Sequence, residues 1–84
     1  MERKEIESKV KEFLVEQLEL EAETIREDAR LKDDLGLESL DFVDIVVIVE
    51  NTFGFKIKLE EMSNVRTVKE FYDYIESKLE ITNF

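Results

Sequence analysis

The chain has 84 residues and carries 22 acidic against 12 basic side chains, a formal net charge of −10 at pH 7. Its length predicts a single domain over residues 1–84, and 43% of the residues are apolar and available for a core. Cysteine and histidine are absent, which excludes thiol chemistry, typical zinc sites and a nucleophile activated by histidine. We therefore expect neither an enzyme nor a dedicated metal site.

Charge and hydropathy also bear on partners and location. Nucleic-acid binding depends on Lys and Arg side chains that neutralise phosphates, so the acidic balance argues against it and predicts attraction to basic protein surfaces. No apolar run is long enough to span a bilayer, and residues 1–5 lack the apolar stretch of a signal peptide. We expect a monomeric, cytoplasmic protein without a membrane span.

Apolar residues recur at helical spacing in the first part of the chain and again in its middle. The first stripe runs from Ile6 to Leu18. The second begins near Ser39 and continues to Phe53, and its run of β-branched residues at 45–49 is also compatible with a buried strand. A two-residue period would bury Asp44, so the helix is favoured. The inner face that we expect for this helix consists of Phe42, Val46, Val49 and Phe53.

The last helix is the most clearly marked. Thr67 and Glu70 have the spacing of a capping box, and apolar residues follow at helical spacing until Leu79, where we expect the helix to end. Residues 53–57 predict a turn and a short extended piece, and residues 59–62 at most a short helix. A long connector over residues 20–37 has apolar anchors at Thr24, Ile25, Leu31, Leu35 and Leu37. The predicted fold class is all-α, a small four-helix bundle of three main helices plus one short helix, with a long first loop.

The negative charge is concentrated in one stretch. Residues 33–50 hold six acids and no base. Acids at a helix N-terminus stabilise it by roughly 0.3–1 kcal/mol each, which explains Glu38 and Asp41 but not Asp44 and Glu50. Leu40 and Val47 fall beside these acids, opposite the expected inner face, so they either form a docking face or pack under the connector or the short third segment.

Ser39 lies at the start of the second helix, where the simplest interpretation of its hydroxyl is a helix N-cap. However, residues 34–41, with the sequence Asp-Leu-Gly-Leu-Glu-Ser-Leu-Asp, resemble the phosphopantetheine attachment motif of acyl carrier proteins, Asp-x-Gly-x-Asp-Ser-Leu. The resemblance continues through the acids of the second helix, the turn at 53–57 and Thr67-Val68. It covers the chain from the first helix to Leu79.

This resemblance implies a four-helix bundle that is not an enzyme. A phosphopantetheinyl transferase would attach 4′-phosphopantetheine from coenzyme A to Ser39, and the thiol of that arm would carry acyl groups as thioesters in fatty acid, polyketide or specialised lipid synthesis. Acyl-loading and acyl-processing enzymes with basic patches would recognise seven residues: Glu38, Leu40, Asp41, Val43, Asp44, Val47 and Glu50. The family also stores acyl chains inside the bundle, which makes Phe42, Val46, Phe71 and Ile75 candidate liners of that space.

Three positions depart from the family pattern. Glu38 replaces the usual Asp before the serine, Asn51 stands where many members have an acid, and Lys58 stands where proline is common. These departures indicate a specialised pathway. Two alternatives stay open from the sequence: a carrier of aminoacyl or peptidyl groups, and a small acidic protein–protein interaction module without a prosthetic group, in which Ser39 is only a cap.

Overall fold

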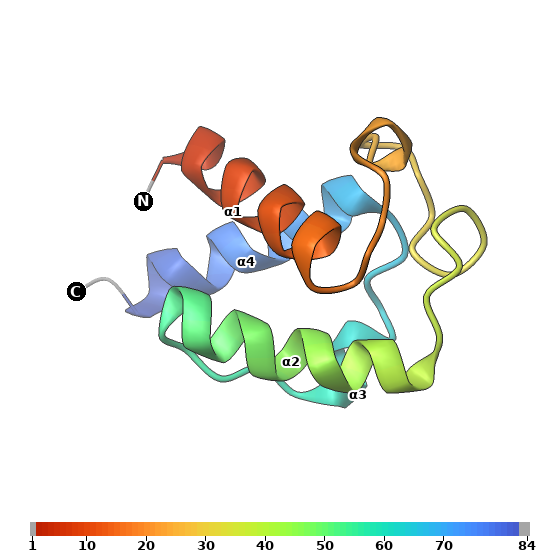
Figure 1. The fold of residues 1–84 in the computed structure, drawn as a ribbon. Coiled ribbons are helices and arrows are strands. Elements are labelled where there is room, and N and C mark those ends of the chain that lie inside the picture. The colour runs from red at the N-terminus through yellow and green to blue at the C-terminus, as the bar shows by residue number, and fades with distance from the viewer. Residues whose placement is uncertain (1, 83–84) are drawn as a thin grey trace.

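The computed structural model describes residues 2–82. Its elements in chain order are α1 (Arg3–Glu16), the 3-10 turn η1 (Ala22–Thr24), α2 (Ser39–Phe53), α3 (Leu59–Met62) and α4 (Val68–Thr82), with no strand within this range. Figure 1 shows α1 beside α4, α2 beyond α4, and the loop that joins α1 to α2 at one end of the molecule. The predicted fold of three main helices, one short helix and a long first loop is confirmed.

The three main helices bury their apolar stripes in one cluster. The aromatic rings of Phe13 in α1 and Phe71 in α4 meet edge to face, with centroids 6.3 Å apart. From α2 the cluster takes Phe42, Ile45 and Val49. The predicted inner face of α2 was therefore wrong by a small rotation about the helix axis. Ile45 is fully buried, whereas Val46 and Phe53 are only half-buried.

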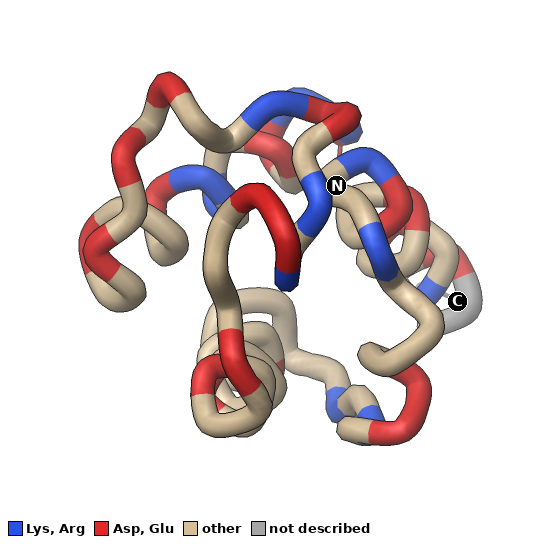
Figure 2. The backbone as a smooth tube through the Cα atoms, turned by 90° about the vertical axis from the view of Figure 1, so that its right-hand side faces the viewer, with Lys and Arg blue, Asp and Glu red and all other residues tan. Residues whose placement is uncertain are grey.

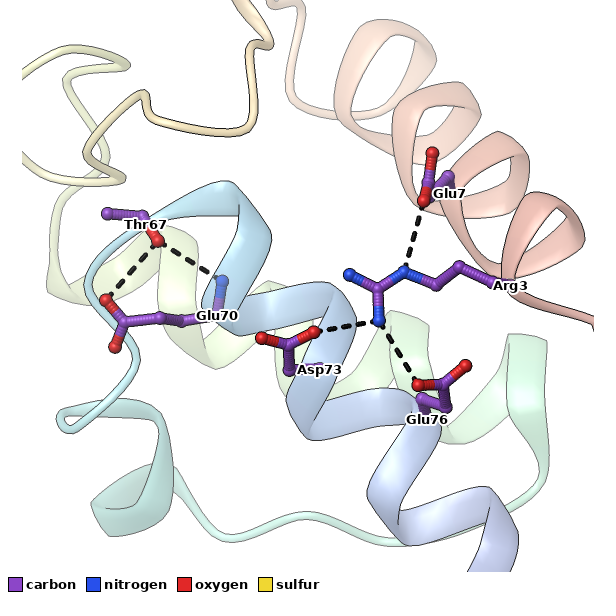
Figure 3. Close-up of polar contacts among 6 residues, drawn as sticks. All are labelled: Arg3, Glu7, Thr67, Glu70, Asp73 and Glu76. Carbon is purple, nitrogen blue, oxygen red and sulfur yellow. Dashed lines mark hydrogen bonds and ion pairs between the residues drawn. The ribbon is translucent and has the colours of Figure 1, made fainter.

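A polar contact joins the same two helices at their edge (Figure 3). The Arg3 guanidinium donates through Nε to Glu7 on its own helix at 3.1 Å. Its Nη1 lies 2.8 Å from Asp73 and 3.3 Å from Glu76, both on α4. One cation therefore links three carboxylates and reduces the repulsion between α1 and α4.

The loop between α1 and α2 is tied to the start of α4. The Leu31 N–H donates to the Arg66 carbonyl at 2.8 Å, and the Val68 N–H donates to the Ala29 carbonyl at 3.0 Å. Five apolar side chains of the loop are buried, namely Ile25, Ala29, Leu31, Leu35 and Leu37. Thr24 is exposed in η1, so its predicted role as an anchor is wrong. Its hydroxyl instead donates to the Glu21 carbonyl at 2.7 Å.

The predicted cap of α4 is confirmed in its main bond. The Glu70 N–H donates to Thr67 Oγ1 at 3.2 Å, and the same hydroxyl lies 3.3 Å from the Glu70 carboxylate (Figure 3). The helix continues to Thr82, three residues beyond the predicted end at Leu79, because no glycine or proline interrupts it there.

Candidate functional site

The first turn of α2 is built by a glycine turn and a capping pair. Gly36 has a φ of +70°, a conformation that favours glycine, and it lets the chain turn into the helix. Glu38 is the N-cap, and its N–H donates to the Asp41 carboxylate at 2.8 Å in a capping box. Ser39 is the first helical residue. The interpretation of Ser39 as the N-cap is therefore wrong, because Glu38 takes that position.

The Ser39 hydroxyl makes no contact that holds the fold. The residue is exposed, and its side chain makes no hydrogen bond within the described part of the chain. It lies at the positive end of a 15-residue helix, where a bound phosphate is electrostatically favoured. A reagent from solution can reach this oxygen without breaking any contact of the fold.

Ser39 borders a small hollow of about 130 Å³, which we call the serine hollow. Its walls come from the long loop, α2 and the region of α3: Lys32, Ser39, Phe42, Leu59, Met62 and Ser63. The Lys32 ammonium lies 5.8 Å from the centre of the Phe42 ring, so a cation lies near the serine in a predominantly acidic molecule. The exposed Ser39, the nearby Lys32 and the N-terminus of α2 together fit a phosphate ester on this serine.

The outward face of α2 exposes apolar side chains. The exposed fractions are 78% for Leu40, 45% for Val43 and 52% for Val47. The alternative that Leu40 or Val47 packs under the connector is therefore wrong. The sequence analysis missed Leu59 of α3, which is 47% exposed and lines the serine hollow. It stands three positions before the buried Met62, in a helix of only four residues, which is too short for a periodic signal.

The acids of residues 33–50 have different roles in the structure. Asp33 pairs with Arg30 at 3.5 Å, and Asp34 accepts the Arg30 N–H at 2.7 Å. Asp44 and Glu50 are exposed and form no ion pair within residues 2–82. In Figure 2, where α2 is seen nearly end-on at the bottom, acidic segments and no basic ones mark this helix. The carboxylates of Asp44 and Glu50 are left for contacts outside the chain.

The four candidate liners for a stored acyl chain are not equivalent. Phe42 borders the serine hollow. Phe71 and Ile75 lie fully buried in the core, and Val46 is half-buried beside it. The structure therefore places only Phe42 next to the exposed serine, and it packs the other three against the core away from the hollow lining.

Two further properties concern the described residues only. No helix among them is long and apolar enough to cross a membrane. No group of three or more acidic, histidine or cysteine side chains within residues 2–82 is arranged to hold a metal ion.

Comparison with known proteins gives the class. Residues 8–75 match the family model described as "Phosphopantetheine attachment site". The chain is 43% identical to an acyl carrier protein of Thermotoga maritima over 77 residues, covering 92% of this chain and 95% of that one. It is 40% identical to an acyl carrier protein of Coprothermobacter proteolyticus over 79 residues, covering 94% and 96% of the two chains.

Solved structures agree with the sequence comparison. The fold matches a crystal structure of an acyl carrier protein from Thermotoga maritima with a TM-score of 0.82 and 36% identity, covering 98% of this chain and 95% of the other. The chain belongs to the acyl carrier protein family. The matched domain is the attachment site for 4′-phosphopantetheine in this family. Members of the family are carriers rather than enzymes, as the resemblance predicted. The interaction module without a prosthetic group is set aside by the same comparisons.

Proposed function

We propose that Ser39 is the residue that carries the phosphopantetheine arm. The observation that supports this most directly is its free hydroxyl: the side chain is exposed at the first turn of α2 and takes no part in the cap. The other serine of the hollow, Ser63, is already committed, because its hydroxyl donates to the Glu60 carbonyl at 2.6 Å. When bound, the arm supplies a thiol, which this chain lacks entirely.

The loading reaction requires an outside catalyst. In the proposed step the Ser39 oxygen attacks the pantetheine-bearing phosphorus of coenzyme A, an O–P bond forms, and the phosphoanhydride bond to the adenosine bisphosphate half breaks. The hydroxyl proton passes to a base of the phosphopantetheinyl transferase, because the chain has no histidine and no other group bonded to Ser39. Lys32, which lines the same hollow as Ser39, and the N-terminus of α2 would stabilise the negative charge of a phosphodiester on Ser39. The proposal includes a cytoplasmic site of action, since this step consumes the intracellular cofactor coenzyme A.

The outward face of α2 is the proposed docking surface for partner enzymes. It combines the exposed Leu40, Val43 and Val47 with the unpaired Asp44 and Glu50. Apolar contacts would provide adhesion, and the acids would attract basic patches on the transferase and on acyl-loading and acyl-processing enzymes. Glu38 and Asp41 belong to this surface as well, although their capping box also holds the first turn of α2.

The proposal also covers the biosynthetic pathway in which the carrier works. Glu38, Asn51 and Lys58 are all exposed, so each departure from the family pattern alters the surface that partner enzymes read. We assign the carrier to fatty acid, polyketide or specialised lipid synthesis, and these exposed differences favour the specialised case.

The intact mass of the purified protein tests the attachment residue. After incubation with coenzyme A and a broad-specificity phosphopantetheinyl transferase, the chain and a Ser63→Ala control should each gain one phosphopantetheine, and Ser39→Ala should gain none. Because Ser39 is exposed and does not cap α2, its replacement should change the free energy of unfolding by less than about 0.5 kcal/mol. A mass gain in folded Ser39→Ala would refute the assignment. If the unaltered chain gains nothing, Glu38→Asp shows whether the longer acid blocks the transferase.

A further inference from the structure

A second and larger hollow adjoins the serine hollow. It has a volume of about 500 Å³, lies between the long loop and the start of α4, and has no residue of α2 in its lining. The two hollows share Lys32 and Ser63 in their walls. We call the larger one the basic hollow, because three cationic side chains line it: Arg30, Lys32 and Arg66.

The charges around the basic hollow are incompletely balanced. Its two acids are already engaged: Asp33 lies 3.5 Å from Arg30, and the Glu70 carboxylate accepts a hydrogen bond from Thr67 at 3.3 Å. Within the described residues, neither Lys32 nor Arg66 has a carboxylate at ion-pair distance. Although the chain has an excess of ten acids, this part of its surface therefore attracts an anion from outside.

The surface around Ser39 changes its charge from one side of the serine to the other. On one side Ser39 lines the serine hollow, whose Lys32 also lines the basic hollow. On the other side the outward face of α2 begins at Leu40 and carries the unpaired Asp44 and Glu50. A standard protein interface covers about 800 Å² on each partner. An enzyme that acts on Ser39 therefore meets cations on one side of the serine and acids on the other.

Backbone bonds fix the walls of the basic hollow. Arg30 and Thr67 form an isolated antiparallel bridge, and the Leu31 N–H donates to the Arg66 carbonyl at 2.8 Å. The backbone positions of Arg30 and Arg66 are therefore set before any partner arrives, which lowers the entropic cost of a contact there.

We propose that the basic hollow receives an aspartate or glutamate side chain of the phosphopantetheinyl transferase that loads this carrier, and that this contact orients Ser39 for the transfer. The inference rests on the proposed attachment at Ser39. An exposed ion pair strengthens binding by at most roughly fivefold, which is too little to retain a free small anion but enough to favour one orientation within a larger interface. Orientation matters in this step, because the serine oxygen must approach the phosphorus in line with the leaving group.

Two matched charge removals separate this contact from the overall acidity of the carrier. Arg66→Gln removes an exposed cation of the basic hollow, and Lys69→Gln removes an exposed cation outside its lining. The kcat/KM of phosphopantetheine transfer is measured at low salt with the transferase encoded in the same genome, the full carrier chain and coenzyme A. Arg66→Gln should lower kcat/KM roughly two- to fivefold, the range for a solvent-accessible ion pair. Lys69→Gln should leave it unchanged or slightly raised, because the carrier becomes more acidic without losing the contact.

A charge exchange between the two proteins identifies the acid on the transferase. Arg66→Glu should lower kcat/KM on the order of tenfold, because two carboxylates then face each other across the interface. Each aspartate and glutamate around the active site of the transferase is replaced by lysine in turn and assayed with this carrier. One of these transferase variants should recover most of the lost kcat/KM with Arg66→Glu, and it should gain nothing with Lys69→Glu. Circular dichroism should find all carrier variants folded.

Each other result overturns the inference in a recognisable way. If the unaltered chain gains no mass at Ser39, the proposed attachment is refuted and this inference with it. If the chain loads but Arg66→Gln and Lys69→Gln change kcat/KM equally, the inference alone is refuted. A loss in Arg66→Glu that no lysine variant of the transferase restores would also refute it, and would assign the basic hollow to an anionic group of coenzyme A instead.

Discussion

The contact between α1 and α4 differs from the outward face of α2 in both packing and charge. Between α1 and α4, Phe13 and Phe71 meet edge to face, and Tyr72 is almost completely buried. The nearby acids are gathered around Arg3 (Figure 3). On α2, Val47 and Leu40 are more than half exposed, and Asp44 and Glu50 form no ion pair within the described chain.

This difference separates the residues that stabilise the fold from those that we propose as the docking surface. Apolar side chains contribute to folding in proportion to the area that they bury, so the α1–α4 contact carries far more of the free energy than the exposed face of α2. Unpaired acids on α2 weaken the compact state slightly through mutual repulsion, so they do not add to the stability of the fold. Substitutions in each of the two regions test this division.

Truncation of Phe71 should give the largest effect. The side chain is fully buried against Phe13, and Phe71→Ala should cost about 3–5 kcal/mol of the free energy of unfolding, a large part of the roughly 5–15 kcal/mol typical of a domain. Urea denaturation measures it. Val47→Ala is the matched truncation on α2 and should cost less than about 0.5 kcal/mol. Similar losses in the two variants would contradict the division between the regions.

Charge reversal on α2 should give the next largest effect, on association rather than folding. Asp44→Lys combined with Glu50→Lys should lower the kcat/KM of phosphopantetheine transfer on the order of tenfold at low salt, because electrostatic steering is lost. Glu5→Lys combined with Glu12→Lys places the same double reversal on exposed positions of α1 and should have little effect. A fall of equal size in this control, or no convergence of the rates at high salt, would remove α2 as the docking surface.

The main helices were predictable because each has an apolar stripe, and α4 also has a local start signal. The spacing of Thr67 and Glu70 predicted the start of α4, and the structure contains the bond between them. Ile45 was missed because an ideal 100° per residue cannot tell which side of a nearly all-apolar helix faces the core. That choice depends on packing against α1 and α4, which is a long-range property.

The attachment site was proposed from the sequence, but its surroundings were not predictable. The motif around Ser39 points to this serine, which stays a prediction, yet the N-cap was assigned to the wrong residue, because serine is a better N-cap than glutamate in general and only the reciprocal Asp41 bond reverses that order here. A hollow between the long loop and the start of α4 brings Arg30 and Lys32 together with Arg66, more than thirty positions later in the chain. No local pattern reveals such a juxtaposition.

Removal of the Tyr72 hydroxyl should strengthen the α1–α4 side by a smaller amount. This oxygen is buried and has no hydrogen-bond partner among the described residues, so Tyr72→Phe should raise the free energy of unfolding by about 1 kcal/mol at neutral pH. Burial, with help from Glu7 and Glu27, raises the pKa of Tyr72 to about 12. The folded protein therefore holds this proton more tightly than the unfolded chain does. As a result, the free energy of unfolding of the unaltered protein does not change through this group below about pH 10, and it falls as the pH rises towards about 12.

Chemical denaturation at neutral and alkaline pH tests this prediction. The advantage of Tyr72→Phe should widen above about pH 10, because phenylalanine has no proton to lose. Tyr74 titrates in both proteins, so the difference between them isolates Tyr72. A variant less stable than the parent at neutral pH would show that the hydroxyl has a partner in solution.

The smallest effect should come from the contact that holds α3 to α4, midway between the two regions in burial. The Tyr74 hydroxyl donates to the Glu61 carboxylate, and Lys78 lies 3.5 Å from the same group. The hydrogen bond from Tyr74, assisted by Lys78, lowers the pKa of Glu61. A carboxyl group with a lowered pKa stabilises the fold above its unfolded value of about 4.3 and loses that contribution as the pH falls through the folded value.

Tyr74→Phe should therefore be slightly less stable than the parent at neutral pH, and the gap should close as the solution is acidified below about pH 4. Urea midpoints measured at both pH values test this. Tyr72→Phe is the control, because its difference from the parent should not change over the same acidic range. If the stability difference between Tyr74→Phe and the parent stayed constant with pH, the tyrosine would stabilise α3 through ring packing alone. The contact would then resemble the apolar α1–α4 side rather than the charged surface of α2.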